Sequence, residues 1–582
     1  AFLFRILVEI AFAGWAILAF WDPAYRPKWH PLTIAVTIFT AIVLIADLTG
    51  VMPLRSIWSN FERMEGFLMI FHLWMFYMAA TYTFGTGEEG KTLWRRWFNV
   101  SCIVALYIAG RATLQWAGKI EIEQSSSRPD STLGNAAYLA VYMLIHAFVA
   151  AYYATVAWTR AKITENRVLP WVYVIMAAFF SLIVFVTQTR GTMVGLLGGA
   201  FVALAIYAMF GKNEQGNRRW IAAGVLGAII LVGVLVWVNR EKPIIANNEA
   251  LNRLTSISFS VFKTEGRSFI WPMAFKGWSE RPILGWGQEN FNYIFNADYN
   301  PHMWSQEQWF DRAHSVFLDW LIASGLVGLL AYLALYVLFL WYIWKSDLTL
   351  AAKSILIGLL VGYAVHNVFV FDNLASYGLF FALLGFVTML SSGQSKRIGG
   401  EKLITTEAVE YIVAPIVIVL FIGSAYYFVI RPIKANLGLI DALINCQGGR
   451  QTMPTSDAFR KALAVDAYVA NQEIREQILS CSSNVIEAQV PTKTKEDFFK
   501  LAMDGINAQT ATAPADARMY TLAGGFLVRI AQFPQAVTYL DKAHTLSPNK
   551  QTIDFDLATA YINTGDRKST RLNSSHVSES RM

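Results

Sequence analysis

The sequence predicts an all-α, polytopic membrane protein with a further α-helical domain outside the membrane, and three observations support this fold class. The 582 residues are 55% hydrophobic and only 15% charged, which is too apolar for a soluble protein. Apolar windows of about 18–22 residues recur, long enough for helices to cross a hydrocarbon core of about 30 Å. A long polar stretch, residues 239–313, separates two blocks of these windows.

The hydropathy pattern predicts about twelve transmembrane helices, eight before the polar stretch and four after it. The first eight cover residues 2–20, 31–48, 66–84, 97–115, 135–158, 168–187, 191–210 and 219–238. The last four cover residues 314–344, 353–370, 374–391 and 409–430. We therefore expect a membrane domain over residues 1–430, in which residues 239–313 form a long loop outside the membrane.

The formal net charge of +7 is explained by topology and requires no nucleic-acid partner. Basic residues gather in alternate short loops, around residues 26–28, 91–96, 160–167, 212–219, 345–353 and 396–402. The positive-inside rule places these loops in the cytoplasm. The long loop, Arg190 and the C-terminal domain are then expected on the opposite, outer side of the membrane.

Both ends of the chain have unusual features. The first residue already lies inside an apolar segment, without a Met or the basic start of a signal peptide, so we expect the sequence to be a fragment. Residues 568–582 are Ser-rich and aperiodic, and we interpret them as a non-native tail.

The three cysteines do not indicate a metal site. Cys102 falls in a predicted span and is expected to be a packing residue, whereas Cys446 and Cys481 fall in the outer domain, where they either form a disulfide or remain reduced. No spacing of Cys and His is typical of structural zinc, so we expect no bound metal.

Residues 431–567 predict an outer domain of amphipathic helices. The segments 520–526, 536–543 and 546–548 resemble a tetratricopeptide repeat, in which small residues let two antiparallel helices approach closely and a proline closes the unit. A second copy starts at Leu557, about one repeat length downstream. The alternative is a generic helical hairpin domain. We expect this domain to bind a protein partner or to position a substrate, because such stacks rarely carry chemistry.

Arg190 is the first candidate site residue. It lies in the short outer turn Thr187-Gln188-Thr189-Arg190-Gly191, between two predicted spans. A guanidinium at the membrane interface can bind a phosphate or diphosphate through forked, charge-assisted hydrogen bonds. An arginine that merely reaches toward lipid phosphates is the alternative interpretation.

Arg267 is the second candidate, and Arg281 is a weaker, supporting one. Arg267 is expected to start an amphipathic helix that contains Trp271 and lies on the membrane surface, after which Gly285 and Gly287 turn the chain. Acidic and basic residues balance in the long loop, so a single specific arginine is favoured over a diffuse lipid-binding patch. The alternative is a salt bridge between Arg267 and Glu265, and Arg281 has a structural alternative as well.

His314 is the third candidate, expected at the outer mouth of its transmembrane helix. An imidazole there can exchange protons with water and take a proton from an acceptor hydroxyl near neutral pH. The alternative is a helix-start histidine bonded to a backbone carbonyl. Asp311 and Arg312 are possible supporting residues. His366 and Asn367, within a span, are expected to make hydrogen bonds between helices.

Together, these elements resemble the O-antigen ligase family, which also covers O-antigen polymerases and bacterial protein O-oligosaccharyltransferases. The matching motifs are Thr189-Arg190-Gly191, Gly266-Arg267 with Trp271 and Leu284-Gly285-Trp286-Gly287, and His314-Ser315 followed by Gly325. The resemblance covers roughly residues 30–395. The order and spacing of the motifs are more specific than any one of them.

The resemblance implies a GT-C-type glycosyltransferase at the outer face of the bacterial inner membrane. Such an enzyme transfers a glycan from an undecaprenyl-diphosphate carrier to an acceptor hydroxyl on a glycolipid or a protein, without a metal or other cofactor. Arg190 and Arg267 would then bind the diphosphate and offset charge on the leaving group. His314 would orient or deprotonate the acceptor hydroxyl.

Two departures from the family leave the acceptor open. Only eight spans precede the long loop where the family's ligases have nine, and an additional span, 409–430, moves the helical domain outside. The same family includes polymerases and protein O-oligosaccharyltransferases, which remain alternatives. Alternatives from other classes are a transporter, which would require inverted repeats and discontinuous helices that the sequence does not clearly show, and a noncatalytic membrane scaffold.

Overall fold

The computed structural model describes residues 1–124, 127–164, 167–211, 217–256, 266–305, 307–393, 395–399, 404–447 and 455–565. The described residues form helices and no strand, and twelve helices are long and apolar enough to cross a membrane. The predicted all-α polytopic fold is therefore confirmed, and the chain is a multi-pass membrane protein. The expected non-native tail, residues 568–582, and Glu265 lie outside the described residues.

Eleven of the twelve spanning helices belong entirely to the membrane domain, and the twelfth continues into the C-terminal domain. Those before the long loop are α1 (Phe2–Trp21), α2 (Pro31–Leu48), α4 (Phe67–Phe84), α5 (Gly87–Trp116), α6 (Ala136–Thr164), α7 (Val168–Val186), α8 (Arg190–Phe210) and α9 (Arg218–Val238). Those after it are α15 (Val316–Lys345), α16 (Leu350–Phe369) and α17 (Leu374–Ser391). Each ends within a few residues of the predicted span, except that α5 begins earlier, since its first turns are polar.

Helices α8 and α16 pack closely against each other, and glycines permit it. A Cβ added to Gly195 would lie 2.5 Å from the carbonyl oxygen of Gly362, and one added to Gly199 would lie 2.3 Å from that of Gly358. Small residues of this kind let transmembrane backbones approach closely. The hydroxyl of Thr192 in α8 also lies 2.7 Å from Nδ1 of His366 in α16, which is the helix-to-helix bond expected for this histidine.

Helix α15 is broken at Ser324 and Gly325, and a segment of the long loop fills the break. Gly325 has φ +63°, and a Cβ there would lie 2.1 Å from the carbonyl oxygen of Ile283. The amide of Trp286 donates to the carbonyl of Ile322 at 2.8 Å, and the amide of Leu326 donates to that of Pro282 at 2.9 Å. The sequence did not clearly show this discontinuity in α15. Loop backbone occupies the break.

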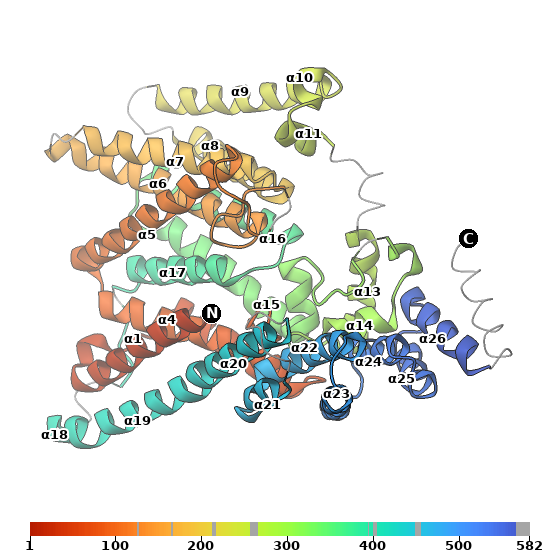
Figure 1. Ribbon diagram of the computed structural model, residues 1–582. Helices are drawn as coiled ribbons and strands as arrows, with labels where there is room; N and C mark the ends of the chain where they lie inside the picture. Colours follow the sequence, from red (N-terminus) through yellow and green to blue (C-terminus); the bar gives the residue numbers. More distant parts are fainter. Residues whose placement is uncertain are drawn as a thin grey trace.

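The long loop and the C-terminal domain lie on the same side of the membrane domain (Figure 1). The loop carries α10 (Pro243–Ala246), α11 (Glu249–Thr255), α13 (Gly266–Glu280) and α14 (Phe291–Ala297). At the other end of the bundle, two of the basic segments contact each other, since the amide of Trp29 donates to the carbonyl of Lys396 at 2.8 Å. The arrangement agrees with the alternation that the charge pattern predicted.

The last spanning helix continues without interruption into the C-terminal domain. It consists of α18 (Thr406–Ala408), a π-helical segment (Val409–Val413), α19 (Ala414–Ala425), a second π-helical segment (Tyr426–Ile430) and α20 (Arg431–Cys446). The composition changes at 431, as the sequence indicated, but the backbone does not. In α20 the residues Ala435, Leu439 and Ala442 are buried in the core of the outer domain, so one continuous helix belongs to both parts.

The outer domain stacks helical hairpins around its own hydrophobic core, which is separate from that of the membrane domain. Its helices are α21 (Asp457–Ala464), α22 (Tyr468–Glu487), α23 (Thr492–Thr512), α24 (Ala517–Arg529), α25 (Phe533–Leu546) and α26 (Gln551–Thr564). A Cβ on Gly524 would lie 2.4 Å from the side chain of Leu540, so a small residue does allow α24 and α25 to pack. The tetratricopeptide-like assignment itself stays a prediction.

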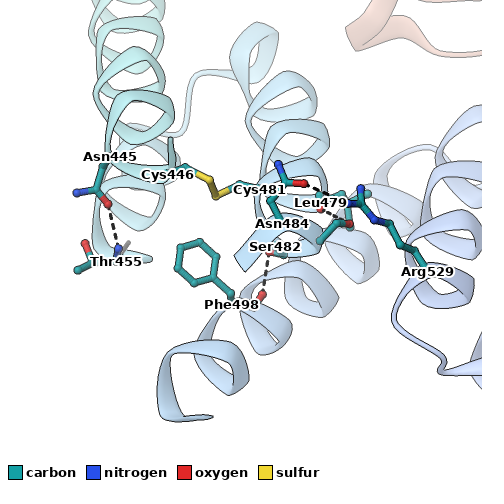
Figure 2. Close-up of a disulfide and its surroundings, with 10 residues drawn as sticks. Asn445, Cys446, Thr455, Leu479, Cys481, Ser482, Asn484, Phe498 and Arg529 are labelled. Carbon is teal, nitrogen blue, oxygen red and sulfur yellow. Dashed lines mark hydrogen bonds between the residues drawn. A yellow bond between two sulfur atoms is a disulfide. The ribbon is translucent and has the colours of Figure 1, made fainter. Parts of the chain in front are cut away.

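A disulfide joins Cys446 at the end of α20 to Cys481 in α22, with the two Cα atoms 6.1 Å apart (Figure 2). The sequence had left this pairing open. Neighbouring bonds hold the same region, including one from the amide of Thr455 to the Asn445 side chain at 2.9 Å. Cys102 is a free, buried cysteine, as its position in a predicted span indicated.

Candidate functional site

The candidate site is organised around residues 369–372, which are the last residue of α16 and the start of the short connection to α17. The carbonyl oxygen of Phe369 accepts a hydrogen bond from Arg267, and that of Val370 accepts one from the amide of Val316 at 3.3 Å. The ring of Phe371 contacts His314. Because α16 ends here, its last carbonyls have no partner within the helix and can bind groups from the long loop.

His314 lies in a left-handed turn just before α15. Its φ is +57°, and its imidazole packs edge-on against the rings of Phe310 and Phe371, each with a centroid separation of 5.2 Å. Its Nδ1 lies 3.1 Å from the carbonyl oxygen of Arg312. A proton on Nδ1 satisfies that carbonyl and leaves Nε2 as an acceptor. The predicted span start at 314 was two residues early, because α15 begins at Val316.

The environment of His314 keeps its imidazole neutral. Burial lowers its pKa to about 4, the bond to the Arg312 carbonyl opposes this shift, and the nearby positive charge of Arg267 adds to it. A neutral imidazole is the form that can accept a proton. His314 therefore has the charge state that a general base requires at neutral pH.

Arg267 is the second residue of α13, as the sequence predicted, and this helix is held against the His314 turn. Its Nη2 donates to the carbonyl oxygen of Phe369 at 2.9 Å. One helical turn later, Nε1 of Trp271 donates to the carbonyl oxygen of Ala313 at 3.2 Å. Residues four apart lie on one helix face, so the same face of α13 fixes both the arginine and the backbone beside His314.

Arg190 is the first residue of α8 and follows the short turn that was predicted. Its Nη2 donates to the hydroxyl of Ser256 at the end of α11, at 3.1 Å. The next residue, Gly191, packs on Phe369, since an added Cβ would lie 3.2 Å from the Cβ of that side chain. Phe369 thus contacts the start of α8 through its side chain and Arg267 through its carbonyl, which brings both arginines to the same end of α16.

Asp311 and Arg312, which precede His314 in the chain, each take part in an ion pair. Arg63 forms a two-pronged bond to Asp311, with distances of 2.6 and 3.0 Å. Burial would raise the pKa of Asp311, but the hydrogen bond and charge of Arg63 outweigh burial and lower it to about 2. Arg312 is buried between Glu289 and Glu65, with Glu65 at 3.1 Å. These pairs fix the turn, which is consistent with supporting roles.

Arg281 and Asp319 have different surroundings. Arg281 is exposed and its guanidinium lies over the ring of Trp286, 5.1 Å from the centroid. Asp319 accepts the amide of Ala313 at 2.8 Å and so caps the turn that carries His314. The contacts of Arg281 favour the structural interpretation.

Sequence reasoning missed the contribution of Phe371. Phe371 contacts His314, Arg312 and Arg63, with the Arg63 guanidinium 4.3 Å from its ring centroid. Next to it, Asp372 is buried and accepts hydrogen bonds from Tyr363 at 2.6 Å and from Ser376 at 2.8 Å. The sequence did place Asp372 at the outer end of a predicted span, where hydrogen bonding between helices was the simpler interpretation, but it gave no signal for Phe371.

The assembled groups suit transfer to a hydroxyl with an anionic leaving group. His314 offers a neutral proton acceptor, and two arginines at the starts of α8 and α13, both of which contact Phe369, offer positive charge for phosphate oxygens. Among the described residues no group of three or more His, Cys, Asp and Glu side chains could hold a metal ion.

Comparison with known proteins identifies one part of the chain. Residues 174–333 match the family model described as O-antigen ligase. This range contains Arg190, Arg267 and His314, and the resemblance drawn from these motifs is confirmed over it. No curated protein matches the chain.

Proposed function

We propose that this member of the O-antigen ligase family, a membrane glycosyltransferase at the family level, transfers a glycan from undecaprenyl diphosphate to an acceptor hydroxyl. The observation that carries the proposal is the gathering of Arg267 and His314 at residues 369–371, with Arg190 at the adjoining start of α8. A base and guanidinium groups that can bind phosphate oxygens suit the displacement of a lipid diphosphate.

In the proposed reaction the acceptor oxygen attacks the anomeric carbon of the lipid-linked glycan. A new glycosidic bond forms as the bond from that carbon to the diphosphate oxygen breaks, and the diphosphate leaves with the electron pair. His314 takes the hydroxyl proton at Nε2, the nitrogen that is not directed at the Arg312 carbonyl. The lowered pKa of His314 keeps this nitrogen unprotonated before the reaction.

Arg190 and Arg267 are proposed to bind the diphosphate. A guanidinium presents parallel N–H groups that match phosphate oxygens and remains charged at every physiological pH. Charge on the leaving group grows as the glycosidic bond breaks, so a fixed cation stabilises the transition state more than the ground state.

The proposed location is the periplasmic face of the inner membrane. The positive-inside rule assigns the basic loops to the cytoplasm. The long loop lies at the opposite end of the bundle, and we therefore propose that it is periplasmic. The disulfide between Cys446 and Cys481 supports an oxidising compartment for the outer domain.

Two alternatives within the family, an O-antigen polymerase and a protein O-oligosaccharyltransferase, differ only in the acceptor. Outside the family, a broken helix is also a feature of transporters, but in α15 the backbone of residues 282–287 bonds across the break. A noncatalytic scaffold would not explain why Arg267 and His314 are positioned by the same connection between α16 and α17.

The proposal is tested with the full chain in lipid vesicles that contain undecaprenyl-diphosphate glycan. Transfer predicts a covalent glycan product on an added glycolipid, polypeptide or second lipid-linked glycan, with release of undecaprenyl diphosphate. Movement of intact lipid-linked glycan across the vesicle wall without any covalent product would instead support a transporter and refute the proposal.

A further inference from the structure

A second pocket lies at the end of the membrane domain that carries the basic loops, on the other side of the bundle from His314. Its walls come from the last turns of α6 and α8 and from the starts of α7, α9 and α16. The basic segments 160–167, 212–219 and 345–353 all contribute to the lining. The pocket encloses about 1490 Å³ including its open mouth, whereas small-ligand sites usually enclose roughly 300–1,000 Å³.

The described lining of this pocket is positively charged and contains no acidic side chain. Arg167 directly precedes α7 and Arg218 is the first residue of α9, and both side chains are exposed. The other described lining residues are threonine, alanine, tryptophan and tyrosine. Two guanidinium groups without a carboxylate in the same lining favour an anionic ligand, and a guanidinium binds phosphate oxygens through paired N–H groups.

Aromatic rings form the wall beside these arginines. Trp158 of α6 and Trp171 of α7 pack edge to face, with ring centroids 5.8 Å apart, and they remain 43% and 58% exposed. Tyr207 of α8 also lines the pocket. Tryptophan and tyrosine are typical of the level at which lipid head groups meet acyl chains. The lining therefore suits an amphiphile with a charged head better than a small soluble anion.

The wall formed by α9 is open to the membrane. This helix lies at the edge of the bundle (Figure 1), and only 6% of its spanning window is buried. Within α9, all of whose residues are described, Ala222 alone is buried, while Ile221 is 63% exposed and Val225 is 46% exposed. Acyl chains cover such apolar surface in a bilayer, so a membrane lipid can reach the pocket from the side.

From these observations we infer that the pocket binds one anionic glycerophospholipid from the leaflet at this end of the bundle. Arg167 and Arg218 bind its phosphate, and its acyl chains lie against Trp171 and the exposed surface of α9. Basic pockets between transmembrane helices are a general means of binding anionic head groups. The inference does not depend on the proposed transfer reaction, because the pocket and the His314 turn lie at opposite ends of the bundle.

Native mass spectrometry of the full chain in detergent tests this inference. The protein is titrated separately with phosphatidylglycerol, which is anionic, and with phosphatidylcholine, which has no net charge. We expect the wild type to bind phosphatidylglycerol more tightly. Arg167→Gln and Arg218→Gln should each weaken that binding about fivefold, and the double variant about 25-fold, while phosphatidylcholine binding stays unchanged.

Arg96→Gln is the matched control, since Arg96 is an exposed arginine of another basic segment and does not line the pocket. Its phosphatidylglycerol binding should equal that of the wild type. The thermal midpoints of all these variants in lipid-free detergent should also equal the wild-type value, because the substituted side chains are exposed. A loss of binding is then not a loss of folding.

Photochemical cross-linking locates the lipid, and competition separates it from a soluble anion. Phosphatidylglycerol with a diazirine in its acyl chain should label α7 or the first half of α9, and an excess of inorganic phosphate should not displace it. Equal affinities for the two lipids, or unchanged binding by the double variant, would overturn the inference. So would an equal loss in Arg96→Gln, cross-links confined to other helices, or displacement by inorganic phosphate.

Discussion

Arg267 Nη2 donates to the carbonyl oxygen of Phe369 at 2.9 Å, which fixes the start of α13 to the end of α16. Two residues later in the chain, the ring of Phe371 packs against His314. One short connection therefore positions both residues to which we assign the chemistry. It lies outside the range that matches the family model, residues 174–333.

Phe371→Leu should lower transfer activity without unfolding the protein. The leucine keeps apolar volume but loses the ring contacts with His314 and with Arg63, worth about 1–2 kcal/mol together, so kcat/KM should fall about tenfold. Phe275→Leu, at an exposed position of α13, is the matched control and should retain activity. Equal activities of the two variants would show that Phe371 does not position His314.

The pH dependence of transfer should reflect the lowered pKa of His314. The base works in its neutral form, and its pKa of about 4 means that protonation begins well below the usual value of 6.5. Activity should therefore stay level as pH falls from 7 to about 5 and decline through about 4. A profile of kcat/KM measured on folded protein checks this. An acidic limb centred near 6.5 would contradict the proposed environment of the imidazole.

Gly325→Ala should destabilise the membrane domain by at least about 2 kcal/mol. The backbone at φ +63° and ψ −164° is strained for any residue with a side chain, and the new methyl would meet the carbonyl of Ile283. Gly378→Ala on α17, where an added Cβ meets nothing within 4 Å, should be neutral or slightly stabilising. Thermal unfolding in detergent compares the two variants, and equal midpoints would refute the explanation.

Cys446→Ser should destabilise the outer domain and leave the membrane domain intact. The disulfide closes a loop between positions 35 residues apart, which corresponds to about 3–4 kcal/mol in the chain-entropy model. Hydrogen exchange should rise in α20–α23 for this variant, and reduction of the wild type should reproduce the change. Unchanged exchange in both cases would show that the disulfide does not stabilise the domain.

Much of the fold could be predicted because each membrane span is recognisable from the hydropathy of its own residues. Twelve apolar windows predicted twelve helices, and all twelve are present. The distribution of basic residues predicted which loops lie on the same side of the membrane. The break at Gly325 could not be predicted, since the apolar pattern runs through it and its cause is a loop segment about forty residues earlier in the chain. Likewise, the helix that ends at Cys446 continues beyond its apolar residues. Hydropathy therefore predicted that the helix ends at residue 430, which is too early.

The site was predictable only in part, because it too depends on contacts between segments that are far apart in the sequence. Arg190, Arg267 and His314 stand out because polar groups at span boundaries are rare, and two of the three start a helix or lie near its start. Phe369 contributes a backbone carbonyl, and Phe371 is one aromatic residue among 39 phenylalanines. Their importance depends on which loop packs against the end of α16, and no local pattern encodes that.

Transfer assays on single-residue variants test the central claim most directly. Arg267→Ala and His314→Ala are compared with Arg281→Ala and His302→Ala, which remove the same side-chain types from exposed positions of the same loop. Each of the first two should lose at least about a hundredfold in kcat/KM, as expected for a missing base or transition-state cation, while the controls transfer normally. Wild-type rates in Arg267→Ala and His314→Ala would contradict the catalytic assignment.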